Sequence, residues 1–197
     1  MAGRRAASDS ARFAMRFAGA RVLREPSREV RRDELGALQP LLRAMERLIS
    51  KENAQGLSAP QLGVGVRLFM LARDADDEAA SPLVAVNPKI MRRSRERQVE
   101  WEACLSVPEY AALVSRPMRV TVAYEDLNGA PVETTLSGNR ARVFQHEMDH
   151  LDGIMYTSRM IASSFTHVSM LHDEAARDAI EEAETQRMDA SDDVRLT

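Results

Sequence analysis

Two histidines in the stretch Gln145-His146-Glu147-Met148-Asp149-His150 stand four residues apart, with a glutamate directly after the first. On a helix this spacing places His146 and His150 about one turn apart on the same face, where both can bind one metal ion. Glu147 then lies beside a water activated by the metal and can act as its general base. A surface helix with two solvated histidines fits the motif alone equally well, so the interpretation depends on a third ligand.

Cys104 is the only cysteine of the chain and the candidate for that third ligand. Two imidazoles and a thiolate with an open fourth position form a hydrolytic metal site, in which the ion acidifies bound water. A free cysteine is more often a small buried hydrophobic residue, and the spacing alone does not prove that Cys104 reaches the histidines. The alternative enzyme class is a zinc peptidase of the His-Glu-x-x-His type with an acidic ligand downstream, where Glu174 is the first glutamate.

The flanking residues predict the elements that must position this chemistry. Ser137 is a candidate N-cap and Gly153 stands where a helix commonly ends, so the motif is predicted to lie on one helix. Leucines, methionine and isoleucine at three- and four-residue spacing predict a second helix over about 40–49. Asn87-Pro88 is predicted to end a strand and Asn128-Gly129 to form a hairpin turn. Strands are predicted at 67–71, 83–87, 119–124 and 132–136, with an acidic loop at 74–81.

Composition limits the class of protein. The chain has 197 residues, a net charge of −3 and a hydrophobic fraction of 44%, which fits one compact domain and argues against binding DNA. It has no apolar run of about 18 residues that would span a membrane. A single cysteine fits a reducing compartment. The predicted organisation is a flexible basic extension at 1–16, a catalytic domain at 17–172 and an acidic segment at 173–197 that is partly helical or frayed.

Three stretches taken together resemble the peptide deformylase family. Its signatures are Gly-x-Gly-x-Ala-Ala-x-Gln, Glu-Gly-Cys-Leu-Ser and Gln-His-Glu-x-Asp-His. The chain carries them in this order as Ala54-Gln55-Gly56-Leu57-Ser58-Ala59-Pro60-Gln61, Glu102-Ala103-Cys104-Leu105-Ser106 and Gln145-His146-Glu147-Met148-Asp149-His150. The resemblance covers roughly residues 20–160. It implies an α+β fold in which antiparallel sheets pack around a central metal-binding helix.

The resemblance also implies a role for each matching residue. Glu147 would carry a proton from the attacking water to the leaving amine. The side-chain amide of Gln61 and the backbone N–H of Leu105 would stabilise the oxyanion. The ligands of one divalent ion, Fe²⁺ in its most active form with Zn²⁺, Ni²⁺ or Co²⁺ as substitutes, would be Cys104, His146 and His150. The reaction would remove the N-formyl group from the N-terminal methionine of newly made polypeptides and release formate.

In the family the substrate peptide lies extended beside the first two motifs, so Gly56 and Ala103 would contribute backbone contacts. Gln55 replaces a usually apolar residue, and Asn139-Arg140 stands where many relatives carry two apolar residues. Gln55 and Val143 are the expected pocket walls. If these polar residues line the pocket, the preference for methionine should be weaker.

Further expectations concern Ser58, an ion pair beside Cys104, the acidic C-terminal segment and the location of the protein. Ser58 stands where the family has alanine, and Glu102 is predicted to pair with Arg116 and brace the Cys104 loop. The acidic C-terminal segment argues against ribosome docking through a basic helix, although the resemblance allows a transient ribosome association. The expected location is the cytoplasm of a bacterium, and the Arg-rich start leaves an organelle as the alternative. A degenerate relative that only binds formylated peptides is the non-enzyme alternative, against which stands the presence of every chemical residue.

Overall fold

The computed structural model describes residues 13–73 and 82–193. It divides into two compact units. The first contains the residues up to Gln98 together with Arg116–Met155, and the second contains Val99–Ser115 together with the residues from Tyr156 on. The acidic loop expected at 74–81 lies outside the described residues, and the prediction of one catalytic domain at 17–172 stays a prediction.

Residues 13–16, at the end of the predicted N-terminal extension, make contacts within the first unit. Phe13 is buried, and the Arg16 N–H donates a hydrogen bond of 2.7 Å to the carbonyl of Gln61. The remainder of that extension, residues 1–12, lies outside the described residues. This contact ties the start of the described chain to the first motif.

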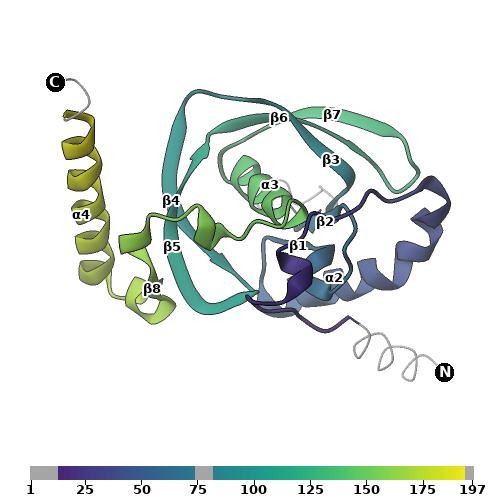
Figure 1. Cartoon of the computed structure of the whole chain (residues 1–197), viewed down its shortest axis with the longest axis horizontal. Coiled ribbons are helices and arrows are strands. Elements are labelled where there is room, and N and C mark those ends of the chain that lie inside the picture. The colour runs from purple at the N-terminus through teal and green to yellow at the C-terminus, as the bar shows by residue number, and fades with distance from the viewer. Residues whose placement is uncertain (1–12, 74–81, 194–197) are drawn as a thin grey trace. The chain divides into compact units, whose positions relative to one another are not determined.

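The first unit is built on a five-stranded sheet in the order β1-β2-β3-β6-β7 (Figure 1). All neighbouring strands are antiparallel. The predicted hairpin at Asn128-Gly129 is confirmed, because it joins β6 to β7. The strands are β1 Gly56–Ser58, β2 Leu68–Leu71, β3 Leu83–Arg93, β6 Arg119–Glu125 and β7 Pro131–Ser137. The short strand β1, which carries the first motif, forms one edge of this sheet.

Helix α2, Gln39–Glu52, follows the 3-10 helices η1, Arg21–Leu23, and η2, Arg32–Leu38. Pro40 lies in the first turn of α2, where a missing backbone N–H breaks no hydrogen bond. The predicted apolar face is buried at Leu41, Leu42, Met45 and Ile49, and Ala44 is buried beside it. The sequence therefore predicted this helix and the face that it buries.

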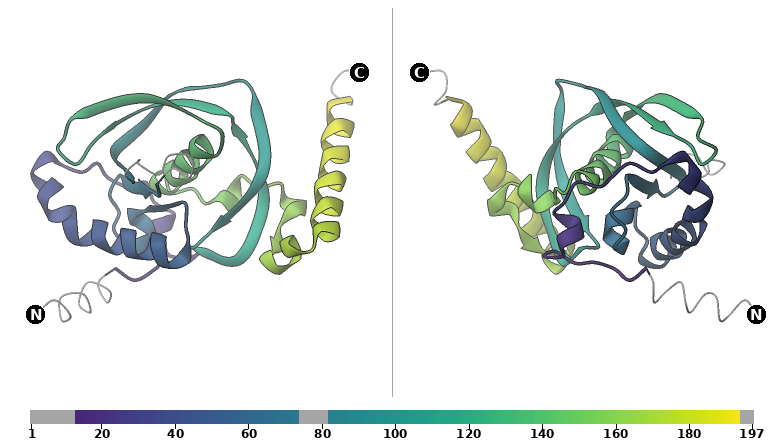
Figure 2. Two further views of the ribbon diagram at one scale, coloured as in Figure 1. Left: turned by 180° about the vertical axis from the view of Figure 1, so that it is seen from behind. Right: turned by 45° about the vertical axis from the view of Figure 1, so that its right-hand side comes forward.

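Helix α3, Gly138–Leu151, carries the two histidines and packs against the five-stranded sheet. Curved strands β3, β6 and β7 arch over it in both views of Figure 2. The core between them contains two rings in edge-to-face contact, Phe69 and Phe144, at a centroid distance of 4.8 Å. Every residue of α3 from Phe144 to Leu151 is buried, including its polar ones. A helix that buries polar side chains needs specific partners for each of them.

The prediction that Asn87-Pro88 ends a strand is wrong, because β3 continues to Arg93. The pairing of β3 with β6 shifts register between Val86 and Lys89, and Asn87 has a φ of 50° there. The Asn87 side chain compensates by accepting from Val30 N–H at 2.8 Å and donating to Val30 O at 3.0 Å. Proline is tolerated at such a bulge, where the ladder is already interrupted.

The second unit contains a three-stranded sheet in the order β4-β5-β8. Its strands are β4 Arg97–Cys104, β5 Val107–Pro117 and β8 Thr166–His167. The acidic segment forms helix α4, Glu174–Asp193, and the bounds predicted for that segment stay a prediction. The indole N–H of Trp101 on β4 donates to Glu181 of α4 at 2.6 Å. Short 3-10 helices η4 Tyr156–Ser158, η5 Ala162–Ser164 and η6 Val168–His172 connect these elements.

The two antiparallel sheets and few helices confirm the predicted α+β class. Within residues 13–73 and 82–193, no helix combines the length and apolar character that crossing a membrane requires.

Candidate metal centre

Helix α3 presents His146 and His150 on one face, as their four-residue spacing predicted. The helix begins after Ser137, whose extended backbone has a φ of −136°, and the chain turns away at Gly153, with a φ of 73°. Both imidazoles are buried, and their ring centroids lie 5.1 Å apart. The pair is therefore held inside the protein rather than solvated on a surface.

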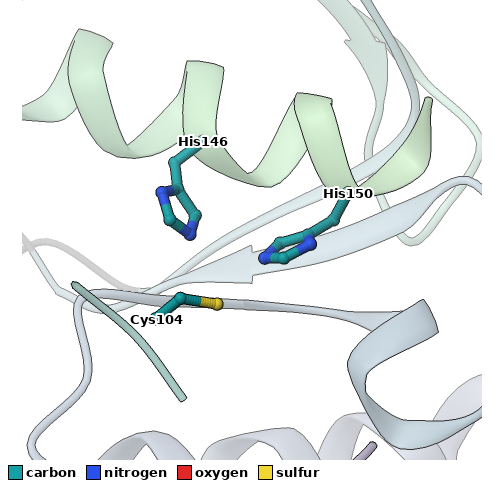
Figure 3. Close-up of side chains that lie close together, drawn as sticks. All are labelled: Cys104, His146 and His150. Carbon is teal, nitrogen blue, oxygen red and sulfur yellow. The ribbon is translucent and has the colours of Figure 1, made fainter. Parts of the chain in front are cut away.

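Cys104 completes the cluster that the sequence predicted. The sulfur of Cys104 and one ring nitrogen each of His146 and His150 all lie within 4.8 Å of one another, and all three residues are buried. In Figure 3 both rings project from α3 toward the sulfur. Among residues 13–73 and 82–193, this is the one group of three or more potential ligands that could hold an ion.

The donor set fits a transition metal. A thiolate and two imidazoles are soft and borderline ligands that suit zinc or iron, whereas magnesium and calcium prefer oxygen donors. Three protein ligands leave a fourth position open, as catalytic sites require. Glu174 is exposed at the start of α4 and is not part of the cluster, which argues against the zinc peptidase alternative.

Cys104 ends strand β4, and the two-residue turn Leu105-Ser106 leads into β5. The Ser106 N–H donates a hydrogen bond of 3.4 Å to the Cys104 sulfur, which orients it from within its own turn. Leu105 lies in that turn, and the role of its N–H in oxyanion binding stays a prediction. Ala103 is exposed on β4, and its contact with a peptide likewise stays a prediction.

Glu147 is buried on α3 and lies directly against strand β1. A Cβ added to Gly56 would stand 2.7 Å from Glu147 Oε1 and 2.9 Å from Val143 Cγ1. Real Cβ atoms do not approach other atoms so closely, so a glycine at this position is what lets the carboxylate occupy its place. The structure thereby brings together three predicted site residues: Gly56, Val143 and Glu147.

Gln61 is buried in η3, Ala59–Leu62, and its amide oxygen accepts two hydrogen bonds from Ser58. The Ser58 N–H donates at 2.8 Å and the Ser58 hydroxyl at 2.9 Å. The family motif has alanine in place of Ser58, so the motif gave no sign of this contact.

A buried ion pair on α3 was also missed. Arg116 Nη1 lies 2.6 Å from Asp149 Oδ2, and both side chains are at most 9% exposed. Asp149 directly precedes His150 in the motif. A carboxylate buried on a helix requires a cationic partner. An acid inside the motif could therefore have indicated a basic partner elsewhere in the sequence. The predicted pairing of Glu102 with Arg116 stays a prediction.

Tyr156 lies close to the second motif. Burial raises its pKa above the ordinary range, and the negative charges of Cys104 and Glu102 act in the same direction. The phenol therefore keeps its proton and donates a hydrogen bond of 3.0 Å to the carbonyl of Tyr110. No sequence motif indicated a role for Tyr156.

The polar departures at 55 and 139 contact one another. Asn139 Nδ2 donates to Gln55 Oε1 at 3.1 Å, and Arg140 donates to the carbonyl of Ala72. Asn139 and Val143 stand four residues apart on α3, so they share the face that also carries Glu147. Gln55 and Asn139, which both depart from the family pattern, are thus joined by a hydrogen bond.

Comparison with known proteins shows one consistent likeness. Residues 14–165 match the family model described as polypeptide deformylase. "Peptide deformylase 2" of Gloeobacter violaceus is 40% identical over 150 residues, which cover 75% of this chain and 79% of that protein. "Peptide deformylase 1A, chloroplastic" of Solanum lycopersicum is 32% identical, over 78% of this chain and 61% of that protein.

Comparison with solved structures shows the same likeness. The peptide deformylase of Synechococcus elongatus, in complex with actinonin, has a TM-score of 0.71 and 38% identity, over 75% of this chain and 80% of that one. The Met-Ala-Ser-bound class I type b enzyme of Acinetobacter baumannii has a TM-score of 0.70 and 34% identity, over 75% of this chain and 98% of that one.

Proposed function

Because the chain belongs to the polypeptide deformylase family, we propose that Cys104, His146 and His150 form its metal centre and that Glu147 carries the proton of its reaction. The enzyme removes the N-formyl group from the N-terminal methionine of newly made polypeptides. Water and the formyl peptide give formate and a free amine. The observation that carries the residue assignment is the buried cluster whose three ligand atoms lie within 4.8 Å of one another.

Each remaining step is assigned to a side chain or backbone group. When bound, the ion acts as a Lewis acid that lowers the pKa of water toward neutrality. Glu147 accepts the proton of the attacking water and delivers it to the leaving nitrogen. The NH₂ group of Gln61 and the N–H of Leu105 donate to the oxygen that becomes negative as the formyl carbon turns tetrahedral. Gly56 and Ala103 contact the extended peptide backbone.

We propose Fe²⁺ as the physiological ion. A thiolate donates charge to the ion and weakens its Lewis acidity, which ferrous iron tolerates readily. The same ligand makes the site sensitive to oxidation. Zn²⁺, Ni²⁺ and Co²⁺ fit the same donor set as substitutes.

The direct test of this function is an assay on protein purified without oxygen. Bound metal is measured, and formate release is followed from a formyl-Met peptide beside its acetylated analogue. We expect turnover of the formyl peptide alone, highest in the iron form. A fully iron-loaded protein that releases no formate would support the non-enzyme alternative, a protein that only binds formylated peptides.

Replacing Gly56 with alanine tests the placement of Glu147. The new Cβ would overlap Glu147 Oε1 at 2.7 Å, so the carboxylate must move. We expect kcat to fall by about 10- to 100-fold, since a displacement of about 1 Å at a reacting group has effects of this size. Bound metal should be unchanged.

Gly65→Ala is the matched control, because a Cβ there meets only Val22 at an ordinary 3.7 Å. This variant should keep full activity. Equal activity of both variants would show that Glu147 does not depend on the glycine at position 56.

We propose that Gln55 and Val143 line the pocket for the first side chain, with Asn139 held against Gln55. Burying an apolar side chain against two amides desolvates them, so methionine should be preferred less than in a pocket with apolar walls. We therefore expect the double variant Gln55→Leu/Asn139→Leu to raise the kcat/KM ratio of formyl-Met to formyl-Gln peptides. An unchanged ratio would place these residues outside the pocket.

We further propose that any transient association with the ribosome avoids helix α4, whose carboxylates would repel RNA phosphates. Loss of a salt-sensitive ribosome association on deletion of the residues after 172 would contradict this. The relatives named above favour a bacterial cytoplasm, with an organelle as the alternative given the chloroplastic relative. Import of the full chain by isolated organelles would favour the alternative.

A further inference from the structure

We propose that Ser58 is a positioning residue that holds the oxygen of the Gln61 amide, so that the NH₂ group of this amide faces away from Ser58 and donates to the reacting carbonyl during catalysis. This inference rests on the proposed role of Gln61. It starts from an observation in the first motif: Ser58 and Gln61 are both fully or almost fully buried, and one side chain contacts the other.

The hydrogen bonds determine which way the amide faces. The Ser58 backbone N–H can only donate, so the atom 2.8 Å from it must be the oxygen of the Gln61 amide. The hydroxyl adds a second donor to the same oxygen at 2.9 Å. Turning the amide over would place its NH₂ group against the N–H donor. The NH₂ group therefore points away from Ser58.

The backbone of η3 is held by other contacts. The Gln61 carbonyl accepts from Arg16 N–H at 2.7 Å, and Gly63 N–H donates to Pro60 O at 2.9 Å in the left-handed turn that ends η3. Ser58 itself is paired in β1 with Phe69 of β2. The Ser58 side chain also accepts from the Gln61 backbone N–H in a capping box at the start of η3. Removing the hydroxyl therefore weakens this cap as well as the hold on the amide, while the other main-chain contacts remain.

Alanine, the residue of the family signature, would retain the backbone N–H but not the hydroxyl. One of two donors would then hold the amide oxygen, and a hydrogen bond of this kind changes an equilibrium by about 2- to 10-fold. We therefore expect Ser58→Ala to lower kcat by about 2- to 10-fold while KM stays unchanged, because the oxyanion donor acts in the transition state rather than in peptide binding.

A double-mutant cycle tests the coupling. Gln61→Leu alone should lower kcat by about 100-fold or more, as the loss of one oxyanion donor does. Adding Ser58→Ala to Gln61→Leu should have no further effect on kcat, because no amide remains to be oriented. A merely structural serine would lower kcat equally in both backgrounds. Metal content and thermal unfolding are measured for every variant.

Ser164→Ala is the matched control. Ser164 is also fully buried, and its hydroxyl accepts from Leu113 N–H at 2.8 Å and donates to Ile161 O at 2.7 Å. This variant should lower the unfolding temperature without changing kcat. Wild-type kcat in metal-loaded Ser58→Ala, or the same loss in both backgrounds, would overturn the role of Ser58. Absence of activity in the wild-type enzyme would instead overturn the proposed function.

Discussion

Replacing Cys104 with serine is expected to remove most of the bound metal and to lower kcat/KM by more than about 100-fold. A serine hydroxyl stays protonated near neutral pH and is a poor ligand for iron or zinc, whereas a thiolate is a strong one. Even substitutions of residues that only support a ligand reduce affinity or activity by about 10- to 100-fold. Metal per chain, measured on protein purified without oxygen, is the primary readout, and formate release is the second.

Two control variants distinguish the proposed metal centre from the zinc peptidase alternative. His172→Ala alters a histidine outside the cluster and should retain both metal and activity. Glu174→Ala removes the acidic ligand that a zinc peptidase would need, and it should also change neither. If Cys104→Ser kept its ion while Glu174→Ala lost it, the peptidase alternative would replace the proposed centre.

Replacing Glu147 with glutamine is expected to lower kcat by about 100- to 10,000-fold, the range that proton transfer by a positioned side chain contributes. Glutamine has nearly the same shape, so it should fit the buried space between Gly56 and Val143. Its amide cannot accept a proton from water and pass it on. Bound metal and KM should therefore stay close to their wild-type values.

Glu147→Asp distinguishes chemistry from packing. It keeps the carboxylate but shortens the side chain by one methylene, so it should retain more activity than Glu147→Gln. Equal losses in the two variants, with metal retained, would mean that the residue supports the geometry of the site rather than moving a proton. A loss of metal in Glu147→Gln would contradict the prediction directly.

Long-range contacts at the site were hardest to read from sequence. Arg116 was paired with Glu102 by charge and family spacing, which stays a prediction, whereas its ion pair with Asp149 was not predicted. The Asn139 contact with Gln55 joins residues 84 positions apart, and the sequence predicted Gln55 as a pocket wall without indicating that Asn139 would bind it. Such pairings depend on how helix α3 packs against Arg116 at the end of β5 and against Gln55 just before β1, which no local pattern encodes.

Local patterns alone determined much of this protein. The four-residue histidine spacing, the apolar face of α2 and the Asn128-Gly129 turn each depend on neighbours within one or two turns, where backbone geometry decides which side chains share a face. The three motifs in order were sufficient to identify the family. The strand end predicted at Asn87-Pro88 failed because a bulge, stabilised by Val30 from a distant segment, carries β3 past the proline.

Only the tertiary structure decided whether the chemistry could assemble. The sulfur of Cys104 and the two imidazoles come from separate parts of the chain, and their approach to within 4.8 Å depends on folding rather than on spacing. The fit of Glu147 against Gly56 and the two hydrogen bonds from Ser58 to Gln61 likewise depend on side-chain rotamers, which packing selects. Sequence supplied the reactive groups, and packing set their distances and orientations.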